Sequence, residues 1–217
     1  LTLLFSAAFG WLVARAVYLP LQKKNASMVV LLIASIALLI LFQNLVQLFF
    51  DADVKNIGYL ATQQGIQISG ASVTPLQLVI ILVSLVLFLG LHLFMKYTPL
   101  GLKMRAVADN KELASIVGIN ERHVAEYSFV IGSVLAGIAG ILIGLEQNLT
   151  PSMGTELMIK GFTGAVVGGV LSVPGAVAGS LLVGIAENFG VWFLPSGYKE
   201  AIAFGLLFLF LLVRPQG

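Results

Sequence analysis

Long apolar runs, separated by short polar segments, make up most of this 217-residue chain. A helix needs about 20 predominantly apolar residues to cross the hydrocarbon core of a bilayer, and several runs approach that length. The pattern therefore predicts an all-α, polytopic membrane protein built as a helical bundle. The expected segments cover about residues 1–19, 26–50, 75–95, 127–145, 157–171, 176–194 and 201–213, of which the fifth is short for a full crossing.

The first of two longer polar segments lies between the second and third apolar runs. Residues 51–74 carry two Asp and two adjacent Gln. We expect a loop here, with strand or turn content between Gly65 and Val73. Pro75 is then expected to open the next apolar helix.

The second polar segment, residues 96–126, has the sequence signals of short helices. Thr98 is a good N-cap, and Pro99 suits a first helical position because its missing N–H is not needed there. A second helix start is predicted at Asp109, with Glu112 three residues later in capping-box spacing.

The helix predicted to begin at Asp109 has one apolar side, formed by Leu113, Ile116 and Val117 at i, i+3 and i+4. Gly118 stands where a left-handed C-cap is wanted, and Asn120 can cap the helix that follows. So short a helix is marginal in water and needs support. Its apolar side could pack under the chain's own membrane helices, or it could dock into a groove on a cytoplasmic partner; the spacing leaves both open.

The composition supports a membrane location and excludes several other functions. Hydrophobic residues make up 59% of the chain and charged residues 10%, whereas soluble domains have about 25% charged residues. The formal net charge of +2 and the lack of a basic cluster interleaved with aromatic residues argue against nucleic-acid binding. The sequence has no Cys and no GxxxxGK[ST] phosphate loop, and no catalytic grouping is evident. We therefore expect neither an enzyme nor a bound cofactor or metal.

Lysine and arginine positions set the expected orientation, because cytoplasmic loops carry an excess of these residues. If the loop holding Lys23 and Lys24 is cytoplasmic, alternation of the segments puts most other basic residues on the same side. The asymmetry predicts that residues 96–126 lie in the cytoplasm. The basic residues sharing that side are Lys96, Lys103, Arg105, Lys111, Arg122 and Arg214, whereas Lys55, Lys160 and Lys199 fall on the other.

Small residues recur at four-residue spacing in the later apolar segments. In lipid such ridges let helix backbones approach closely, which is how helices associate without a hydrophobic drive between them. We expect these ridges to be packing faces. They are Gly132/Ala136/Gly140/Gly144, Gly164/Gly168, Gly175/Gly179 and Ser180/Gly184.

A few polar residues lie at membrane depth. Gln43 and Asn44 fall inside the second segment, and Glu187 and Asn188 inside the sixth. A carboxylate in hydrocarbon is costly and should find a partner, for which Lys160 on the neighbouring segment is the obvious candidate. These five residues could line the route of a polar substrate. For Glu187 the residues by themselves favour a structural buried pair instead.

Three stretches resemble permease subunits of branched-chain amino acid ABC importers, the LivH type. TPLGLKMRAVADNKELASIVGI resembles the cytoplasmic loop of that family, and the chain from LTPSMGTELMIKG to its end resembles the family's C-terminal half. LLIASIALLILFQNLVQLFF is similar to its span with a Gln-Asn pair. The resemblance covers nearly the whole chain.

The resemblance implies an inner-membrane subunit that pairs with a second, homologous permease. Two cytoplasmic ATPase subunits would drive the pair, and a periplasmic binding protein would deliver the substrate. Related permeases carry branched-chain amino acids, other amino acids, urea or short amides, so the substrate stays open. The loop would be an ATPase-coupling site, which favours docking of the Leu113/Ile116/Val117 side. The other residues matching that loop are Gly101, Arg105, Ala106, Asp109, Asn110, Ala114 and Gly118.

The resemblance also implies a single transmembrane permease domain over residues 1–217. Family members carry an Asn-Phe-Ala-His-Gly stretch that this sequence lacks, and the chain opens on Leu1 inside an apolar run. We therefore expect an N-terminally truncated chain.

An ion- or proton-coupled secondary transporter of small polar solutes is the alternative function. Glu187, Lys160 and the short, glycine-interrupted fifth segment would suit such a protein. The capped helix in the cytoplasmic loop favours the ABC importer, because a self-sufficient transporter has no need of a docking helix.

Overall fold

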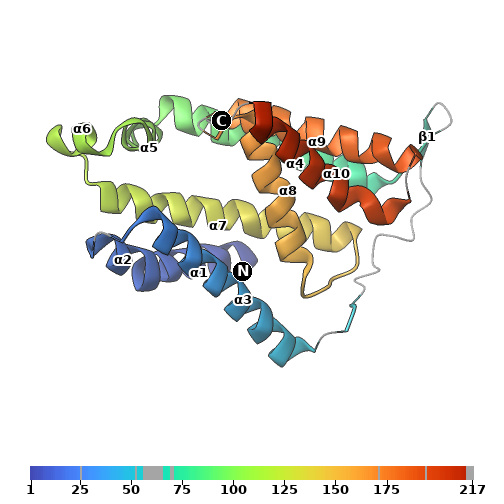
Figure 1. Ribbon diagram of the computed structural model, residues 1–217, viewed down its shortest axis with the longest axis horizontal. Helices are drawn as coiled ribbons and strands as arrows, with labels where there is room; N and C mark the ends of the chain where they lie inside the picture. Colours follow the sequence, from blue (N-terminus) through green and yellow to red (C-terminus); the bar gives the residue numbers. More distant parts are fainter. Residues whose placement is uncertain are drawn as a thin grey trace. The chain divides into compact units, whose positions relative to one another are not determined.

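The computed structural model describes residues 1–24, 26–51, 53–55, 66–68, 71–170, 172–193 and 195–213 (Figure 1). Two compact units, Leu1–Ser152 and Met153–Gly217, divide the chain. The first unit contains α1 (Thr2–Val13), the π-helix η1 (Ala14–Tyr18), α2 (Leu19–Lys23), α3 (Met28–Phe50), β1 (Ile66–Ile68), β2 (Ala71–Val73), α4 (Pro75–Tyr97), α5 (Pro99–Asp109), α6 (Lys111–Ile116) and α7 (Glu121–Glu146). The second contains α8 (Met153–Gly168), α9 (Val173–Phe193), the 3₁₀-helix η2 (Ser196–Tyr198) and α10 (Lys199–Val213).

Every apolar run predicted from the sequence is helical, which confirms the all-α, polytopic prediction. Among the described residues, five helical segments are long and apolar enough to cross a membrane by length and composition. α8, with 16 residues, and the apolar part of α10, Ala201–Leu212, are shorter, so their crossing stays a prediction. Arg214, one of the basic residues used to predict orientation, lies outside the described residues. The five longer segments are Thr2–Lys23, Val29–Phe50, Pro75–Tyr97, Glu121–Glu146 and Val173–Phe193.

The first helical segment contains a short π-helix just before a proline. Pro20 lacks a backbone N–H and would clash with the preceding turn of a regular α-helix. The wider turns of η1, Ala14–Tyr18, lie where that conflict falls, and α2 continues the segment beyond. Ala14 is buried and the Tyr18 hydroxyl lies 2.6 Å from Ser35 Oγ, so the π-helix also joins α1 to α3.

The polar segment after α3 ends in a two-stranded antiparallel pair, in the region where strand or turn content is expected. β1 and β2 pair antiparallel, with Ile66 opposite Val73. The next residue, Thr74, forms a capping box with Gln77: Thr74 Oγ1 accepts from Gln77 N–H at 3.3 Å, and Gln77 Oε1 accepts from Thr74 N–H at 3.2 Å. Two orphan donors are thereby satisfied where α4 begins.

α7 packs against α1 through a row of small residues that lies beside the predicted ridge. A methyl group at Gly10 would overlap Ser133, and one at Gly137 would overlap Ser6. A Cβ at Gly132 or Gly140 would meet no atom within 4 Å. The Gly132/Ala136/Gly140/Gly144 ridge is therefore not the α1-facing surface. That surface lies one residue further round the helix, where Ser133 and Gly137 continue a row from Phe129, whose ring centroid is 4.4 Å from that of Tyr18.

In the second unit, α8 and α9 form a closely packed helical hairpin, as their small-residue spacing predicted. A methyl group at Gly179 would overlap the backbone of Gly164 and Gly168, and one at Gly164 would overlap Ser180. Backbones this close require glycine on both helices. Gly169, with φ of +97°, begins the turn between them in a conformation that side chains disfavour.

Much of the apolar surface is not covered by the chain itself. Along the most apolar 18 residues of α3, and likewise of α4, no residue is buried by the rest of the structure. Ile33, Leu48 and Leu82, for example, each expose more than half of their surface. Apolar helix faces of this extent require lipid or other apolar protein surfaces around them.

Candidate functional site

The polar loop after α4 is a compact pair of short helices. Thr98 caps α5, because its Oγ1 accepts from Gly101 N–H at 3.1 Å, as predicted. Gly101 is buried where α5 turns back on α4, and a side chain there would overlap the backbone of Phe94 and Met95. The sharp turn between the two helices therefore needs both the cap and the glycine.

The prediction that the second helix begins at Asp109 is wrong by one residue. Asp109 is the last residue of α5, and Asn110 is the N-cap of α6, its Oδ1 accepting from Leu113 N–H at 3.0 Å. Asn110 has the extended backbone that an N-cap needs, with φ of −152° and ψ of 109°. Glu112 is consequently the second residue of the helix rather than the third, which removes the predicted capping box.

The end of α6 follows the sequence signals. Gly118 has φ of +82°, the left-handed conformation expected at a C-cap. Asn120 then caps α7, since its Oδ1 accepts from Arg122 N–H at 3.1 Å. Side-chain or glycine caps thus stand at both ends of α6 and at the start of α7, which holds the loop in one shape.

The two sides of α6 differ sharply in burial. Ala114 is 3% exposed and is buried together with Met104 of α5 and Val124 of α7. On the other side, Leu113 is 61% exposed and Ile116 is 78% exposed, with Val117 similarly uncovered. The described chain therefore supports α6 from one side and leaves its apolar stripe open.

The remaining residues of the predicted coupling set occupy different environments. Arg105 is exposed, and its Nη2 donates to the Lys96 carbonyl oxygen at 3.4 Å. Ala106 is half-buried and Asp109 exposed. Gly101 and Ala114 are inside the loop, so they shape it instead of offering a surface. The sequence interpretation did not include Met104 and Val124, although both occupy apolar positions within helical turns.

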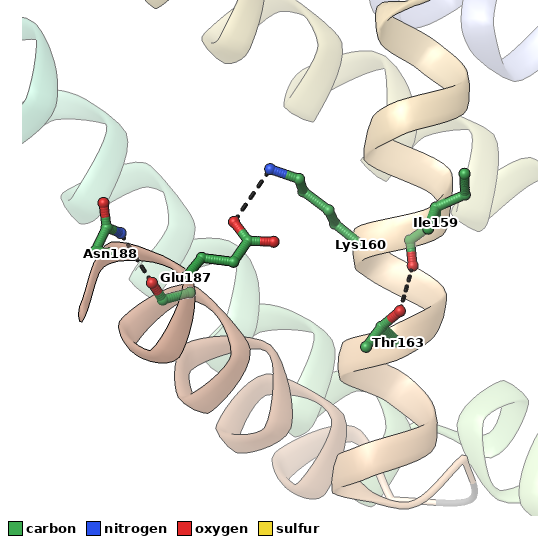
Figure 2. A network of polar contacts seen from close by, with 6 residues as sticks. Ile159, Lys160, Thr163, Glu187 and Asn188 are labelled. Carbon is green, nitrogen blue, oxygen red and sulfur yellow. Dashed lines mark hydrogen bonds and ion pairs between the residues drawn. The ribbon is translucent and has the colours of Figure 1, made fainter. Parts of the chain in front are cut away.

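In the second unit, the predicted partner of Glu187 is confirmed. Lys160 Nζ on α8 lies 3.1 Å from Glu187 Oε2 on α9, as Figure 2 shows. Glu187 is 7% exposed, whereas the Lys160 side chain is 37% exposed. The second oxygen, Oε1, is buried and accepts no hydrogen bond from the described residues.

The other polar side chains near this pair are bound to their own helices (Figure 2). Thr163, which the sequence interpretation did not single out, is fully buried, and its hydroxyl donates to the Ile159 carbonyl oxygen at 2.9 Å. Asn188 is exposed, and its Nδ2 donates to the Gly184 carbonyl oxygen at 2.8 Å. Lys160 and Glu187 are thus the side chains that face each other across α8 and α9.

The predicted pathway residues of α3 lie in the other unit. Asn44 is exposed, and its Nδ2 donates to the Ile40 carbonyl oxygen at 2.7 Å. Gln43 is half-buried. The structure therefore brings together Lys160 and Glu187, and it leaves the grouping of Gln43, Asn44 and Asn188 with them a prediction.

In the part of the chain that the structure describes, five helical segments of spanning length, with wide apolar faces open to their surroundings, define a multi-pass membrane protein. Residues 1–211 match the model of the family described as branched-chain amino acid transport system / permease component, so the chain belongs to this family. It is a membrane permease subunit of an ABC importer, a class of transporter in which permeases associate with other components.

Three relatives show how far the similarity extends. The chain is 36% identical to the high-affinity branched-chain amino acid transport system permease protein BraD of Pseudomonas aeruginosa, over 100% of this chain and 71% of the relative. It is 36% identical to LivH of Salmonella typhimurium and 35% identical to LivH of Escherichia coli K12, in each case over 99% of this chain and 71% of the relative. Both are named high-affinity branched-chain amino acid transport system permease proteins. No solved structure matches the chain.

Proposed function

We propose that this chain forms, together with a second homologous permease, the route by which branched-chain amino acids or related small polar compounds cross the inner membrane into the cytoplasm. The names of the relatives support the substrate class. Residues 1–217 act as one transmembrane permease domain. A periplasmic binding protein delivers the substrate, and two cytoplasmic ATPase subunits supply the energy.

The observation that carries the proposal is the open apolar stripe of α6. The six-residue helix exposes Leu113 and Ile116, and its C-cap residue Val117 is exposed beside them, whereas Ala114 on the opposite side is buried. The loop that carries the stripe is the one predicted to lie in the cytoplasm. Such a stripe suits the helix-in-groove mode of recognition. We assign the groove to an ATPase subunit, since the permease needs a mechanical connection to the source of energy.

A connection of this kind must move as a rigid body. The cap at Asn110 and the left-handed turn at Gly118 fix the two ends of α6, while Ala114 fixes its inner side. Arg105, Ala106 and Asp109 complete the surface on α5. When the ATPase closes on ATP, displacement of its groove would carry α6, and through α5 and α7 it would move the membrane helices.

Replacing Ile116 with Asp tests the docking. The carboxylate would have to be desolvated in an apolar groove without a partner, at a cost of several kcal/mol or more. We expect Ile116→Asp protein to reach the membrane in normal amounts, to lose the co-purifying ATPase and to lose uptake. The matched control is Ser115→Asp, which places the same charge one residue away on the polar side of α6, where Ser115 is exposed.

The wild-type preparation provides the reference for this experiment. It should carry a second permease and two ATPase subunits, as measured by the mass of the solubilised complex. An Ile116→Asp variant that keeps its ATPase and transports normally would show that the stripe serves another purpose. Failure of the variant to accumulate would instead mean that α6 packs under its own membrane helices.

A further inference from the structure

We propose that Lys160 and Glu187 bind the charged head group of a zwitterionic amino acid as it passes through the permease, an inference that rests on the proposed function. Three observations carry it. The Glu187 carboxylate is more than nine-tenths buried, its Oε1 accepts no hydrogen bond from the described residues, and the Lys160 ammonium beside it is partly exposed.

The carboxylate half of the site lacks a donor. Burying a carboxylate oxygen without a hydrogen bond is unfavourable, and more so for a charged group than for a neutral one. The bond from Lys160 satisfies Oε2 and leaves Oε1 as an acceptor. A substrate ammonium is a suitable donor, because it brings both hydrogen bonds and the opposite charge.

The Lys160 ammonium has N–H donors that its bond to Glu187 does not use. An ammonium group has three N–H donors, and the bond to Glu187 uses one of them. With 37% of its side chain exposed, Lys160 can be approached from outside the α8–α9 hairpin. A substrate carboxylate would meet these donors, and displacement of the flexible Lys160 side chain would open the buried Oε1 of Glu187 to the neighbouring substrate ammonium.

The pair also accounts for a property that a transport site needs. Binding must be favourable enough for a substrate to enter and weak enough for it to leave. Lys160 Nζ and Glu187 Oε2 already pair across 3.1 Å, so a zwitterion would have to share or replace an existing ion pair. Both charges stay paired with and without substrate, and the net gain on binding is therefore small.

Thr163 does not compete for this role. Its hydroxyl donates to the backbone of its own helix, at Ile159, and it is fully buried (Figure 2). Lys160 and Glu187 therefore determine the local chemistry, and that chemistry selects molecules that carry both charges close together. A neutral compound such as a short amide would gain much less from it.

Neutralising variants in the assembled transporter test the proposal. Glu187→Gln removes the charge and keeps the side-chain length, and Lys160→Gln removes the charge and leaves a somewhat shorter polar side chain. In proteoliposomes with saturating binding protein and radiolabelled L-leucine, we expect maximal uptake to fall at least about tenfold in either variant, as for truncation of a buried charge pair. Membrane abundance and co-purifying ATPase should stay within about twofold. The control is Glu156→Gln on α8, an exposed carboxylate of the same helix.

Exchanging the two charges distinguishes an ion pair that binds substrate from one that is purely structural. The double variant Lys160→Glu/Glu187→Lys restores an ion pair between α8 and α9 but reverses the positions that the head group would meet. We expect it to assemble and still to lack uptake. Recovery of uptake in the double variant, or uptake within about twofold of wild type in Glu187→Gln, would overturn the proposal.

Wild-type uptake shows which of the two claims fails. Normal L-leucine uptake by the wild type, unaffected by Glu187→Gln, contradicts the binding site and leaves the proposed function standing. A wild-type transporter that imports urea or a short amide and no zwitterionic amino acid likewise contradicts only the binding site, whereas a wild-type transporter that imports none of these compounds contradicts both claims.

Discussion

The loop formed by α5 and α6 differs from the hairpin formed by α8 and α9 in which side chains it exposes and in what holds it together. The loop turns apolar side chains outward and is held together by side-chain caps at Thr98 and Asn110. The hairpin turns a charged pair inward and is held together by glycine backbones in close approach. In water, capping hydrogen bonds can hold a helix too short to be stable alone. In lipid, close packing replaces the hydrophobic drive that water would supply.

Each region therefore carries side chains that are unfavourable in the surroundings proposed for it. An exposed apolar stripe in the cytoplasm and a buried carboxylate in the membrane both carry a cost. A cost of this kind points to a partner, which we take to be an ATPase for α6 and a substrate head group for Glu187. The two regions can be disturbed separately, because each depends on its own contacts.

The largest effect on the hairpin should come from adding a methyl group at its tightest point. Gly179→Ala would place a Cβ against the backbone of Gly164 and Gly168, which cannot move aside as a side chain can. Overpacking of this kind costs about 1–3 kcal/mol. We expect a lower midpoint of thermal unfolding in detergent. Gly184→Ala on the same helix meets no atom within 4 Å and should leave the midpoint unchanged or slightly higher. Equal midpoints for the two variants would mean that the helices are not so close.

A smaller effect is expected in the loop when the cap of α6 is removed. Asn110→Ala deletes the acceptor of the Leu113 N–H, at a cost of about 1 kcal/mol. We expect a several-fold loss of co-purifying ATPase because the formed helix is less populated, while Asn110→Asp, which keeps a capping oxygen, should bind normally. Equal losses of ATPase in Asn110→Ala and Asn110→Asp would contradict the assignment of Asn110 as the cap.

Most of the local structure of the loop could be predicted from the sequence, because a capping signal involves residues only a few positions apart. Thr98, Gly118 and Asn120 act as predicted. The start of α6 was misplaced because Asp109 and Asn110 are adjacent and both are good capping residues, so composition alone could not choose between them. The exposure of the Leu113/Ile116/Val117 side could not be predicted either, since spacing identifies an apolar side and not what covers it.

In the membrane helices, the ion-pair partner could be predicted because few charged residues were available as candidates. Lys160 was identified as the partner of Glu187 because charges are scarce in these segments. The row of α7 that faces α1 was not singled out, because small residues occur on two neighbouring rows, one through Gly132 and one through Gly137. Which row meets another helix depends on contacts far apart in the chain. The orphaned Oε1 of Glu187 likewise depends on three-dimensional placement.

The docking of α6 on an ATPase is the central claim, and thiol protection measures it most directly. Residues 1–217 contain no Cys, so Ile116→Cys gives this stretch a single thiol, at a position that is 78% exposed in the chain alone. The measurement is the rate of maleimide labelling in membranes containing the complete transporter and in membranes stripped of the ATPase. The account predicts rapid labelling after stripping and at least about tenfold slower labelling with the ATPase bound, because a seated side chain at an interface core is desolvated. Equal rates in the two preparations would contradict it.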